Sequence, residues 1–366
     1  MSIHHGSRRS VRGQGWLTLA AFVWLSAVQP LSGQSSPGDL LDLTLAELGA
    51  LELEQDLEAV SGSAPRRGQW QVRHSYVRGE FEGYRSDTRR VANSEIIGPP
   101  DGRTFPILQN NIVQEAHLIA ISFGLSDRLS VQFVAPYLRQ RTDHESIVEG
   151  YSSFSISSLR VGDLAATVSG VVVADAHQSL TISTGISVPT RSIMKTGNTP
   201  SGPGSQLPYT MQLGSGTFDV PLAIRYRRTV GESARLGRVE YGLSGLAKFR
   251  MGTNSRGYCL GDRLVVGTSM RAHPWQRIAP SIGVSGEVWG DIEGHDSNFP
   301  GPIYPTPVAS PLLGGLRASA EAGLRFTIRR SVSADVDVSI PVYQSLSGPQ
   351  PEEDWRLSFG WTWSGR

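Results

Sequence analysis

The sequence predicts an all-β protein, a transmembrane antiparallel β-barrel of about 12 strands with a short amphipathic helix before it. Three observations support this prediction. Apolar and polar residues alternate along many segments, aromatic residues lie near the ends of these segments, and short connections alternate with longer ones. The 366 residues include 41 Gly and 22 Pro, which break helices and mark turns, so the composition favours strands joined by turns.

Residues 1–33 are expected to be a secretory signal peptide. Arg8, Arg9 and Arg12 form a basic region, and the apolar run WLTLAAFVWLSAV follows it at 16–28. This run of about 13 residues is shorter than the roughly 20 that a membrane-spanning helix needs, which disfavours the alternative of a transmembrane anchor. We therefore expect export, cleavage near Gly33 and localisation in the outer membrane.

Residues 34–68 are expected to form a periplasmic N-terminal segment. Within 39–60 (DLLDLTLAELGALELEQDLEAV), leucines recur near helical spacing with acidic residues between them, which predicts a short amphipathic helix. This stretch resembles the acidic leucine segment that follows the signal peptide in several outer-membrane protein families. The helix could bind a periplasmic partner or rest against the barrel mouth, and a tail without a partner is the alternative.

The period of the pattern changes to two from Gln69 onward, so residues 69–366 are expected to form the barrel. In SVSADVDVSIPVY (331–343), Val336 and Val338 fall on one face, while Asp335, Asp337 and Tyr343 fall on the other. The expected strands lie at 69–86, 111–125, 128–143, 158–174, 178–190, 212–229, 236–252, 262–273, 276–291, 314–329, 331–345 and 354–364. Most of them are long enough for tilted membrane spans, which favours a membrane barrel over a soluble sandwich.

Connections between these strands are alternately short and long. The short ones lie near 126–127, 175–177, 231–236, 274–275 and 330, and the long ones at 87–110, 144–157, 191–211, 253–261, 292–313 and 346–353. Short periplasmic turns and longer outer loops are typical of outer-membrane barrels, and an even strand number places both chain ends in the periplasm. The aromatic residues expected in interfacial girdles are Trp70, Tyr76, Tyr137, Tyr226, Trp289, Tyr343, Trp355 and Trp363.

The outer face and the last strand imply two partners. Outer-membrane lipid is expected around the barrel, and the barrel-assembly machinery is expected to contact the C-terminal strand. Trp361 and Trp363 supply the aromatic alternation that this machinery reads, while Ser364, Gly365 and Arg366 overhang the usual terminal aromatic.

Several segments resemble the outer-membrane transporter family associated with phenol-degradation (meta-pathway) gene clusters. They are SSLRVGDLAATVSG (157–170), ISTGISVPT (182–190), MQLGSGTFD (211–219), LGDR (260–263) and IPVYQSLSG (340–348). The GSG-x-x-D core from Gly214 to Asp219 is the most specific, and the resemblance covers most of 69–366. It implies an outer-membrane barrel that takes up small aromatic or otherwise hydrophobic molecules, although a fold does not decide a substrate.

Charged residues on the polar faces are expected to line a lumen, because the apolar faces should meet lipid. The lumen-lining candidates are Asp163, Asp219, Arg225, Arg227, Glu240, Lys248, Arg250, Arg271, Glu321, Arg325, Asp335 and Asp337. Glu287, Arg317 and Arg356 are charges expected on the same polar faces. The two signs nearly cancel, so these residues either only pair with one another or line a weakly selective polar path through Arg225, Arg250 and Asp219. The stretches 162–163 and 216–219 are expected to be bulges or points where loops fold inward.

The predicted function is an outer-membrane channel or transporter for small molecules, and two alternatives stay open. One is an enzyme of the outer-membrane phospholipase type, because His295, Asp296, Ser297 and Asn298 resemble that enzyme's His-x-Ser-Asn core. This stretch falls in a Gly/Pro-rich loop, so no catalytic residue is assigned. The other alternative is a non-conducting receptor or adhesin that uses the long loops.

Nucleic-acid and metal functions are disfavoured. The formal net charge of +1 gives no footprint for nucleic acid. The histidines are scattered without the spacing of a zinc site, so no metal ligand and no cofactor is expected. His144 with Asp143 and Glu145 could bind a cation in an outer loop, but a solvated loop is the favoured interpretation. Cys259 is the single cysteine, which excludes an intramolecular disulfide and leaves its own role open.

Overall fold

A computed structural model describes the chain over residues 65–366, apart from residues 101–103, 191–192, 297 and 300–313. The signal peptide expected at 1–33 and the helix expected at 39–60 lie outside the described residues. Among the described residues, no helix has the length and apolar character needed to cross a membrane.

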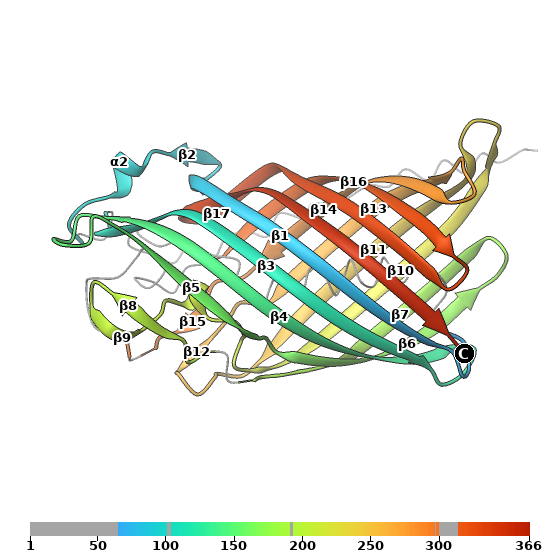
Figure 1. The fold of residues 1–366 in the computed structure, drawn as a ribbon, viewed down its shortest axis with the longest axis horizontal. Coiled ribbons are helices and arrows are strands. Elements are labelled where there is room, and N and C mark those ends of the chain that lie inside the picture. The colour runs from blue at the N-terminus through green and yellow to red at the C-terminus, as the bar shows by residue number, and fades with distance from the viewer. Residues whose placement is uncertain (1–64, 101–103, 191–192, 297, 300–313) are drawn as a thin grey trace, which may run out of the picture. The chain divides into compact units, whose positions relative to one another are not determined.

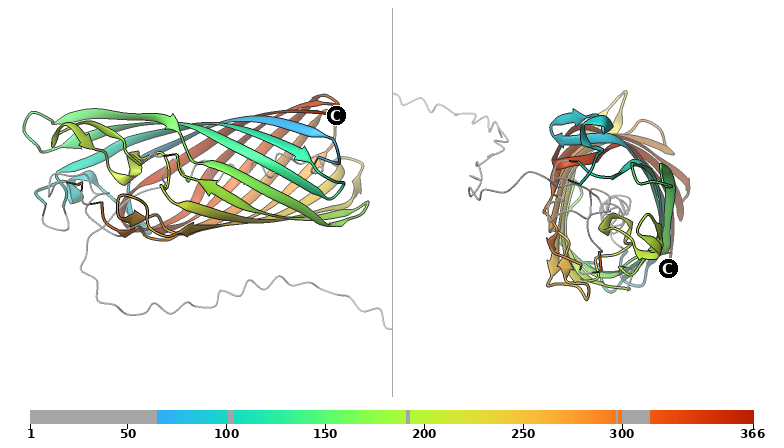
Figure 2. Two further views of the ribbon diagram at one scale, coloured as in Figure 1. Left: turned by 90° about the horizontal axis from the view of Figure 1, so that it is seen from below. Right: turned by 90° about the vertical axis from the view of Figure 1, so that its left-hand side faces the viewer.

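Eleven labelled strands form one closed antiparallel barrel (Figures 1 and 2). They are β1 (Trp70–Asp87), β3 (Ile107–Gly124), β4 (Leu129–Ser146), β6 (Leu164–Ala174), β7 (Gln178–Val188), β10 (Phe218–Ser233), β11 (Gly237–Met251), β13 (Arg263–His273), β14 (Ile278–Trp289), β16 (Gly315–Arg329) and β17 (Val332–Gly365). Each pairs with the next in chain order, and β17 closes the ring on β1. Trp70 pairs with Gly365, so the barrel begins and finishes at one end, the terminal end. The opposite end is the loop end.

The long strand β17 contains two antiparallel segments. Its first part pairs with β16, from Val332 to Leu346, and its second part pairs with β1 up to Gly365. The Ser364 N–H donates to the Ser331 carbonyl at 2.9 Å, which joins the two parts side by side. The wall therefore has twelve segments, in agreement with the predicted number.

Residues 346–353 were predicted to be a connection between strands, but they form part of the wall. Phe81 pairs with Glu353 and Asp87 pairs with Leu346, because β1 continues to the loop end and offers them a partner. Ser364 and Gly365 likewise continue the strand instead of overhanging it, since they pair with residues 70–71.

The wall segment expected at 158–174 is interrupted. Strand β5 (Ser153–Val161) and strand β6 both pair with β4, and Gly162 and Asp163 separate them. Their separation is a bulge in one continuous edge, because Val161 pairs with Tyr137 and Ala165 pairs with Val134. The sequence predicted a bulge or an inward-folding loop here.

Small elements occupy the connections at the loop end. They are β2 (Arg89–Val91), α2 (Asn93–Ile96), β8 (Thr196–Thr199), β9 (Gly202–Gln206), the 3₁₀ helix η1 (Tyr209–Met211), β12 (Tyr258–Cys259) and β15 (Glu293–Gly294). Strand β8 pairs with β9, and β12 pairs with β15. Buried aromatic and aliphatic residues of these connections pack together, with Tyr209 contacting both Tyr258 and Phe299 edge-on.

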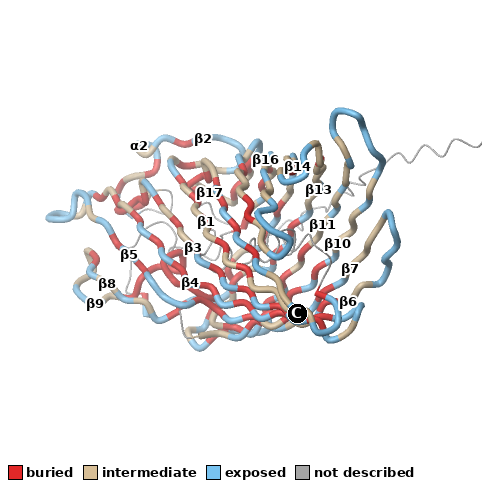
Figure 3. Tube along the Cα trace, turned by 45° about the vertical axis from the view of Figure 1, so that its right-hand side comes forward, coloured by how far each residue is buried: buried red, intermediate tan, exposed pale blue. Residues whose placement is uncertain are grey.

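The outer face of the barrel is apolar. Ile121 and Phe133 are 50% and 57% exposed, whereas their strand neighbours Ser122 and Gln132 are buried. Figure 3 shows this alternation of buried and exposed positions along the strands. A soluble monomer rarely exposes so much contiguous apolar surface, so this face suits lipid.

The apolar belt ends before the strands do at the loop end. Along β4, the exposed positions change from Phe133 and Tyr137 to Arg139 and Arg141. Arg139 lies 3.4 Å from Glu115 of β3, in an ion pair on the same face. Because charged side chains belong outside the hydrocarbon layer, the last part of β4 projects beyond it.

One aromatic residue differs from the expected girdle, and another lies on a different face from the one that alternation predicts. Trp289 is buried, because it shares the inner face with Glu287, two residues before it. Tyr343 is exposed beside Val342 instead of facing inward. The register against β16 slips between Tyr343 and Pro341, and this bulge shifts the alternation.

Candidate functional site: a charged lumen narrowed by an inward loop

The twelve residues predicted to line the lumen are shielded from the surroundings of the barrel. Five are buried: Asp163, Asp219, Lys248, Arg250 and Asp335. Seven are half-buried: Arg225, Arg227, Glu240, Arg271, Glu321, Arg325 and Asp337. The residues that alternate with them on β10, such as Leu222 and Ile224, are apolar and about half exposed. This arrangement is that of a polar inner face and an apolar outer face.

A loop from Ile193 to Thr217 enters the loop end of the lumen. Its Leu213 is fully buried against Val77, Ala116 and Leu138, which lie on the inner faces of β1, β3 and β4. The end view in Figure 2 shows this yellow-green segment inside the ring of strands. The chain leaves the wall after β7 and returns at β10, and between them Leu213 reaches the inner faces of β1, β3 and β4, so the loop narrows the lumen.

The strand predicted at 212–229 was wrong over residues 212–217. Strand β10 begins at Phe218, and residues 212–217 belong to the inward loop. Gly216 has φ +71°, a backbone conformation that a strand does not use and that glycine adopts without strain. The resemblance to the GSG-x-x-D segment marked this place, but alternation alone extended the strand through it.

The GSG-x-x-D residues anchor the loop to the wall. The N–H and the hydroxyl of Ser215 both donate to Asp163, at 2.7 and 2.8 Å. The Thr217 hydroxyl donates to Asp219 at 2.7 Å, and the Arg250 guanidinium donates to the same carboxylate at 2.5 Å. Lys248 lies 3.7 Å from it. The structure thus brings together four of the predicted residues, in one buried group at the base of the loop.

Gly162 allows the loop to approach the wall closely. A Cβ atom at this position would lie 2.6 Å from the Leu138 Cδ1 and 3.1 Å from the Leu213 carbonyl oxygen. The bulge at Gly162 also turns Asp163 toward Ser215. The expected inward folding at residues 162–163 and 216–219 is therefore present, with the loop seated between the two places.

A second charged group lies on the facing wall near the loop end. Glu287 contacts Arg263 and Arg317, and Glu353 contacts Arg317 and Arg356, with all five side chains almost completely buried. Charges buried this deeply remain ionised only when they are paired. Three guanidinium groups and two carboxylates thus face the inward loop from strands β13, β14, β16 and β17.

Three members of this second group, Glu287, Arg317 and Arg356, were expected among the lumen charges, and two were not. Glu353 was assigned to a connection, and Arg263 was the second residue of its expected strand at 262–273. Alternation could have found Arg263, because it lies on the same face of β13 as Arg271, eight residues later. The Arg317 guanidinium also lies over the Trp289 ring, 5.5 Å from its centroid, which explains a buried tryptophan among charges.

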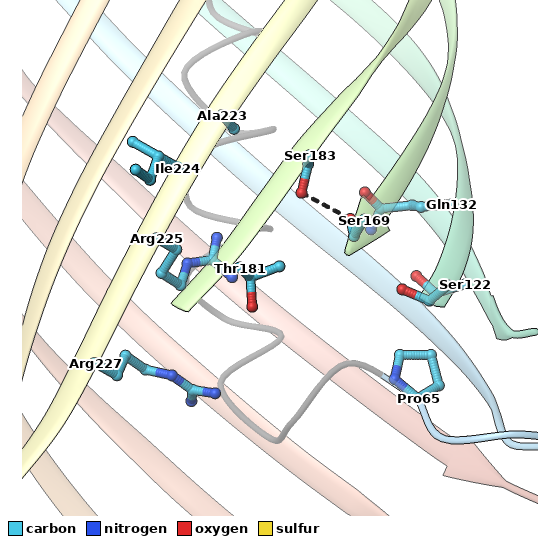
Figure 4. Close-up of a pocket in the computed structure, with 11 residues that line it drawn as sticks. Pro65, Ser122, Gln132, Ser169, Thr181, Ser183, Ala223, Ile224, Arg225 and Arg227 are labelled. Atoms are coloured by element: carbon cyan, nitrogen blue, oxygen red, sulfur yellow. Dashed lines mark hydrogen bonds between the residues drawn. The ribbon is translucent and has the colours of Figure 1, made fainter. Parts of the chain in front are cut away.

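A polar pocket lies in the lumen toward the terminal end (Figure 4). Hydroxyl and amide side chains form one side of it, and Arg225 and Arg227 of β10 form the other. The hydroxyl and amide residues are Ser122, Ser130, Gln132, Ser169, Thr181 and Ser183. Ser169 and Ser183 share a hydrogen bond of 2.7 Å across β6 and β7. Pro65, the first described residue, also lines the pocket.

The other predicted charges of this half form separate pairs. Arg73 donates two hydrogen bonds of 2.9 Å to Asp335, and Arg325 lies 3.9 Å from the same carboxylate. The Ser285 hydroxyl donates to Glu321. Glu240 lies 2.8 Å from Arg238 and 3.5 Å from His273. The predicted set is therefore divided among several places, and only part of it meets the pocket.

The residues considered as a cation site lie on opposite faces of β4. His144 is buried, with its ring stacked on Phe154 at 4.6 Å, whereas Asp143 bonds to the exposed Arg141. This contradicts the grouping in an outer loop, because neighbouring residues of a strand point to opposite sides. Within the described parts of the chain, no three His, Cys, Asp or Glu side chains are placed to hold a metal ion.

The comparisons with known proteins agree with a barrel. No family model matches the chain, and no curated protein matches it. A crystal structure of an outer membrane channel from Pseudomonas putida F1 is similar, with a TM-score of 0.56 and 13% identity, over 83% of this chain and 97% of that one. The transport unit of the autotransporter AIDA-I from Escherichia coli has a TM-score of 0.44 and 10% identity, over 87% and 96% of the chains. The NanC porin has a TM-score of 0.39 and 5% identity, over 79% and 98%. At such identities, the first of these likenesses shows the fold alone.

Proposed function

We propose that this protein is an outer-membrane channel for small molecules. One observation carries the proposal: a closed barrel wall has an apolar outer face and a polar, charged inner face, and a loop folds into the lumen. The outer face suits lipid, while the inner face offers hydrogen bonds and charges to water and solutes. The inward loop sets the width of the path at the loop end.

The nature of the solute belongs to the same proposal. The resemblance to the phenol-degradation family implies aromatic or hydrophobic solutes, and nearby genes for aromatic breakdown would support that association. The described pocket near Arg225 and Arg227 is lined mainly by hydroxyl, amide and guanidinium groups, which favour hydrophilic solutes. We infer that hydrophilic solutes pass through the lumen more readily than hydrophobic ones.

Location and assembly follow from the outer face. We infer that the chain resides in the outer membrane after cleavage of the signal peptide. The assembly machinery would recognise the second part of β17, where Phe359, Trp361 and Trp363 are exposed on the outer face.

An enzyme of the phospholipase type receives less support. Asp296 is fully buried, and its carboxylate lies 3.1 Å from Arg256 and accepts hydrogen bonds from Asn298. His295 packs its ring against Phe299. These contacts stabilise the loop-end packing, while Ser297 lies outside the described residues.

Single-channel recording in planar bilayers tests the proposed channel. The full mature chain should give discrete conductance steps in KCl. Leu213→Ala should increase the step size, because it removes the contact that fixes the inward loop to β1, β3 and β4. Leu243→Ala removes the same atoms from the outer face and should leave the steps unchanged. A folded, heat-modifiable barrel that never conducts would exclude the channel.

A further inference from the structure

The pocket near the terminal end has an excess of positive charge among the residues that line it. Among the described residues, Arg225, Arg227 and Arg271 share one lumen surface with a single carboxylate, Glu240. Glu240 is itself contacted by the exposed Arg238, at 2.8 Å, and by His273, at 3.5 Å. The described side chains of this part of the lumen, three guanidinium groups and one carboxylate, carry a net positive charge, whereas the described charges at the loop end nearly balance.

The spacing of the arginines suits one anionic group. Arg225 and Arg227 are two residues apart on β10, so they share a face, and Figure 4 shows both side chains extending into the pocket. Guanidinium groups bind carboxylates through paired N–H donors in a fixed plane. Two of them side by side can donate hydrogen bonds to both oxygens of one carboxylate.

The facing wall can bind the rest of a hydrophilic molecule. Ser122, Ser130, Ser169 and Ser183 turn small hydroxyl groups toward the arginines, and each can donate or accept. Gln132 lies among them, is 6% exposed and has a side-chain oxygen that meets no hydrogen-bond partner among the described residues. Such a buried amide oxygen is suited to a donor on a ligand.

The size of the pocket fits a polar group better than a ring. Its free space is about 40 Å³. This holds a few water molecules or a carboxylate, while a cavity of roughly 150 Å³ is the kind that takes up benzene. The polar lining and the small volume therefore both favour a polar group over an aromatic ring.

We propose that Arg225 and Arg227, with the hydroxyl and amide residues opposite them, bind the carboxylate group of small hydrophilic organic acids in the lumen. The site rests on the proposed channel function and gives it a substrate class. A carboxylate could also come from this chain, since residues 37–64 contain seven acidic residues and no Lys or Arg, and Pro65, which follows them in the sequence, lines the pocket.

The test compares an acid with its neutral analogue. Gluconate added to the purified full mature chain in planar bilayers should interrupt the KCl current in a concentration-dependent way, whereas sorbitol should not. The double variant Arg225→Gln/Arg227→Gln should weaken this block by about tenfold or more and still conduct KCl. Arg228→Gln, next along β10 but exposed, is the matched control and should behave like the original protein.

Equal effects of gluconate and sorbitol, or an unchanged block in the double variant, would overturn the carboxylate site and leave the channel intact. If the protein does not conduct, calorimetry on the detergent-solubilised protein tests the carboxylate site separately from the channel function. Gluconate binding that depends on Arg225 and Arg227 in a protein that never conducts would support the site and exclude the channel.

A variant that lacks residues 37–60 distinguishes the two sources of the carboxylate. If the acidic segment occupies the site, its removal should strengthen gluconate binding at least tenfold, and the double arginine variant should abolish that gain. If free solutes are the source, removal should leave the affinity unchanged. Either result supports a carboxylate site, and a gain that persists in the double arginine variant contradicts it.

Discussion

The loop end and the terminal end of the lumen use the same alternating strands differently. At the loop end, buried carboxylates meet arginines at hydrogen-bond distance, and an inward loop packs against the wall through Leu213. Toward the terminal end, serines and Gln132 face Arg225 and Arg227 across a pocket. The comparison teaches that inward-facing charge serves two purposes: to fix a constriction where it is paired, and to offer a surface to solutes where it is in excess.

The largest effect is expected from Asp219→Asn, which tests whether paired charges fix the inward loop at the loop end. The substitution leaves Arg250 and Lys248 buried without their carboxylate, and it should lower the free energy of unfolding by about 3–5 kcal/mol. Urea unfolding followed by tryptophan fluorescence measures this, and the conductance should rise as the loop loosens. Glu232→Gln, exposed on the same strand, is the control. Unfolding of Asp219→Asn at the original urea concentration would show that pairing does not fix the constriction.

Acid should destabilise the loop end through His144, which lies beyond the apolar belt on β4. Burial lowers its pKa from 6.5 to about 4. Between these pH values, His144 is protonated in the unfolded chain but not in the folded chain. The free energy of unfolding therefore falls as the pH drops from about 6.5 to about 4. The loss should approach 3 kcal/mol.

Urea midpoints at pH 7 and pH 4.5 measure this contribution. His144→Phe keeps a ring against Phe154 and should reduce the difference between the two midpoints. His177→Phe, in an exposed turn, should not reduce it. An identical pH difference in the original protein and in His144→Phe would contradict the assignment.

A smaller effect is expected where the loop approaches the wall. Gly162→Ala forces a Cβ against Leu138 and the Leu213 carbonyl, and such overpacking costs about 1–3 kcal/mol. Thermal unfolding of the detergent-solubilised barrel measures it. Gly170→Ala in the same wall segment meets its nearest atom at 4.0 Å and serves as the control. Equal melting temperatures for the two variants would mean that the loop does not depend on this contact.

The smallest effect is expected on the outer face. The Tyr226 hydroxyl donates to the Gln178 side chain at 2.8 Å, and Tyr226→Phe removes this bond. The loss should be about 0.5–1.5 kcal/mol in thermal unfolding, without a change in conductance. Tyr241→Phe on the neighbouring strand controls for loss of a hydroxyl. A conductance change in Tyr226→Phe would show that the outer face also shapes the path.

The strands could be predicted because a barrel wall requires alternation at almost every position. Val336 and Asp335 reveal their faces from the sequence, whatever their partners are. The loop from Ile193 to Thr217 could not be predicted in this way, since its course depends on packing against Leu138, far away in the chain. The resemblance at Gly214 to Asp219 singled out the segment that anchors this loop to the wall. It did not predict the residues that this segment contacts.

The charged pairs show the same division. Asp219 and Arg250 were both predicted to face inward, and their register across β10 and β11 then places them together. Glu353 was missed because its strand pairs with β1, and that pairing appears only when the barrel closes. Alternation in the sequence predicts which face of the wall a residue lies on. To predict a site, one also needs to know which residues are its neighbours, and these depend on the register between strands.

The pairing of Trp70 with Gly365 has a consequence for the order of folding. The first and last wall segments are separated by nearly the whole described chain, and joining ends so far apart carries a closure entropy on the order of 5 kcal/mol. Until the C-terminal segment arrives, β1 offers an unpaired edge on which other chains could assemble. Closure is thus the late, concentration-sensitive step of biogenesis, because the wall is complete only when the second part of β17 pairs with β1.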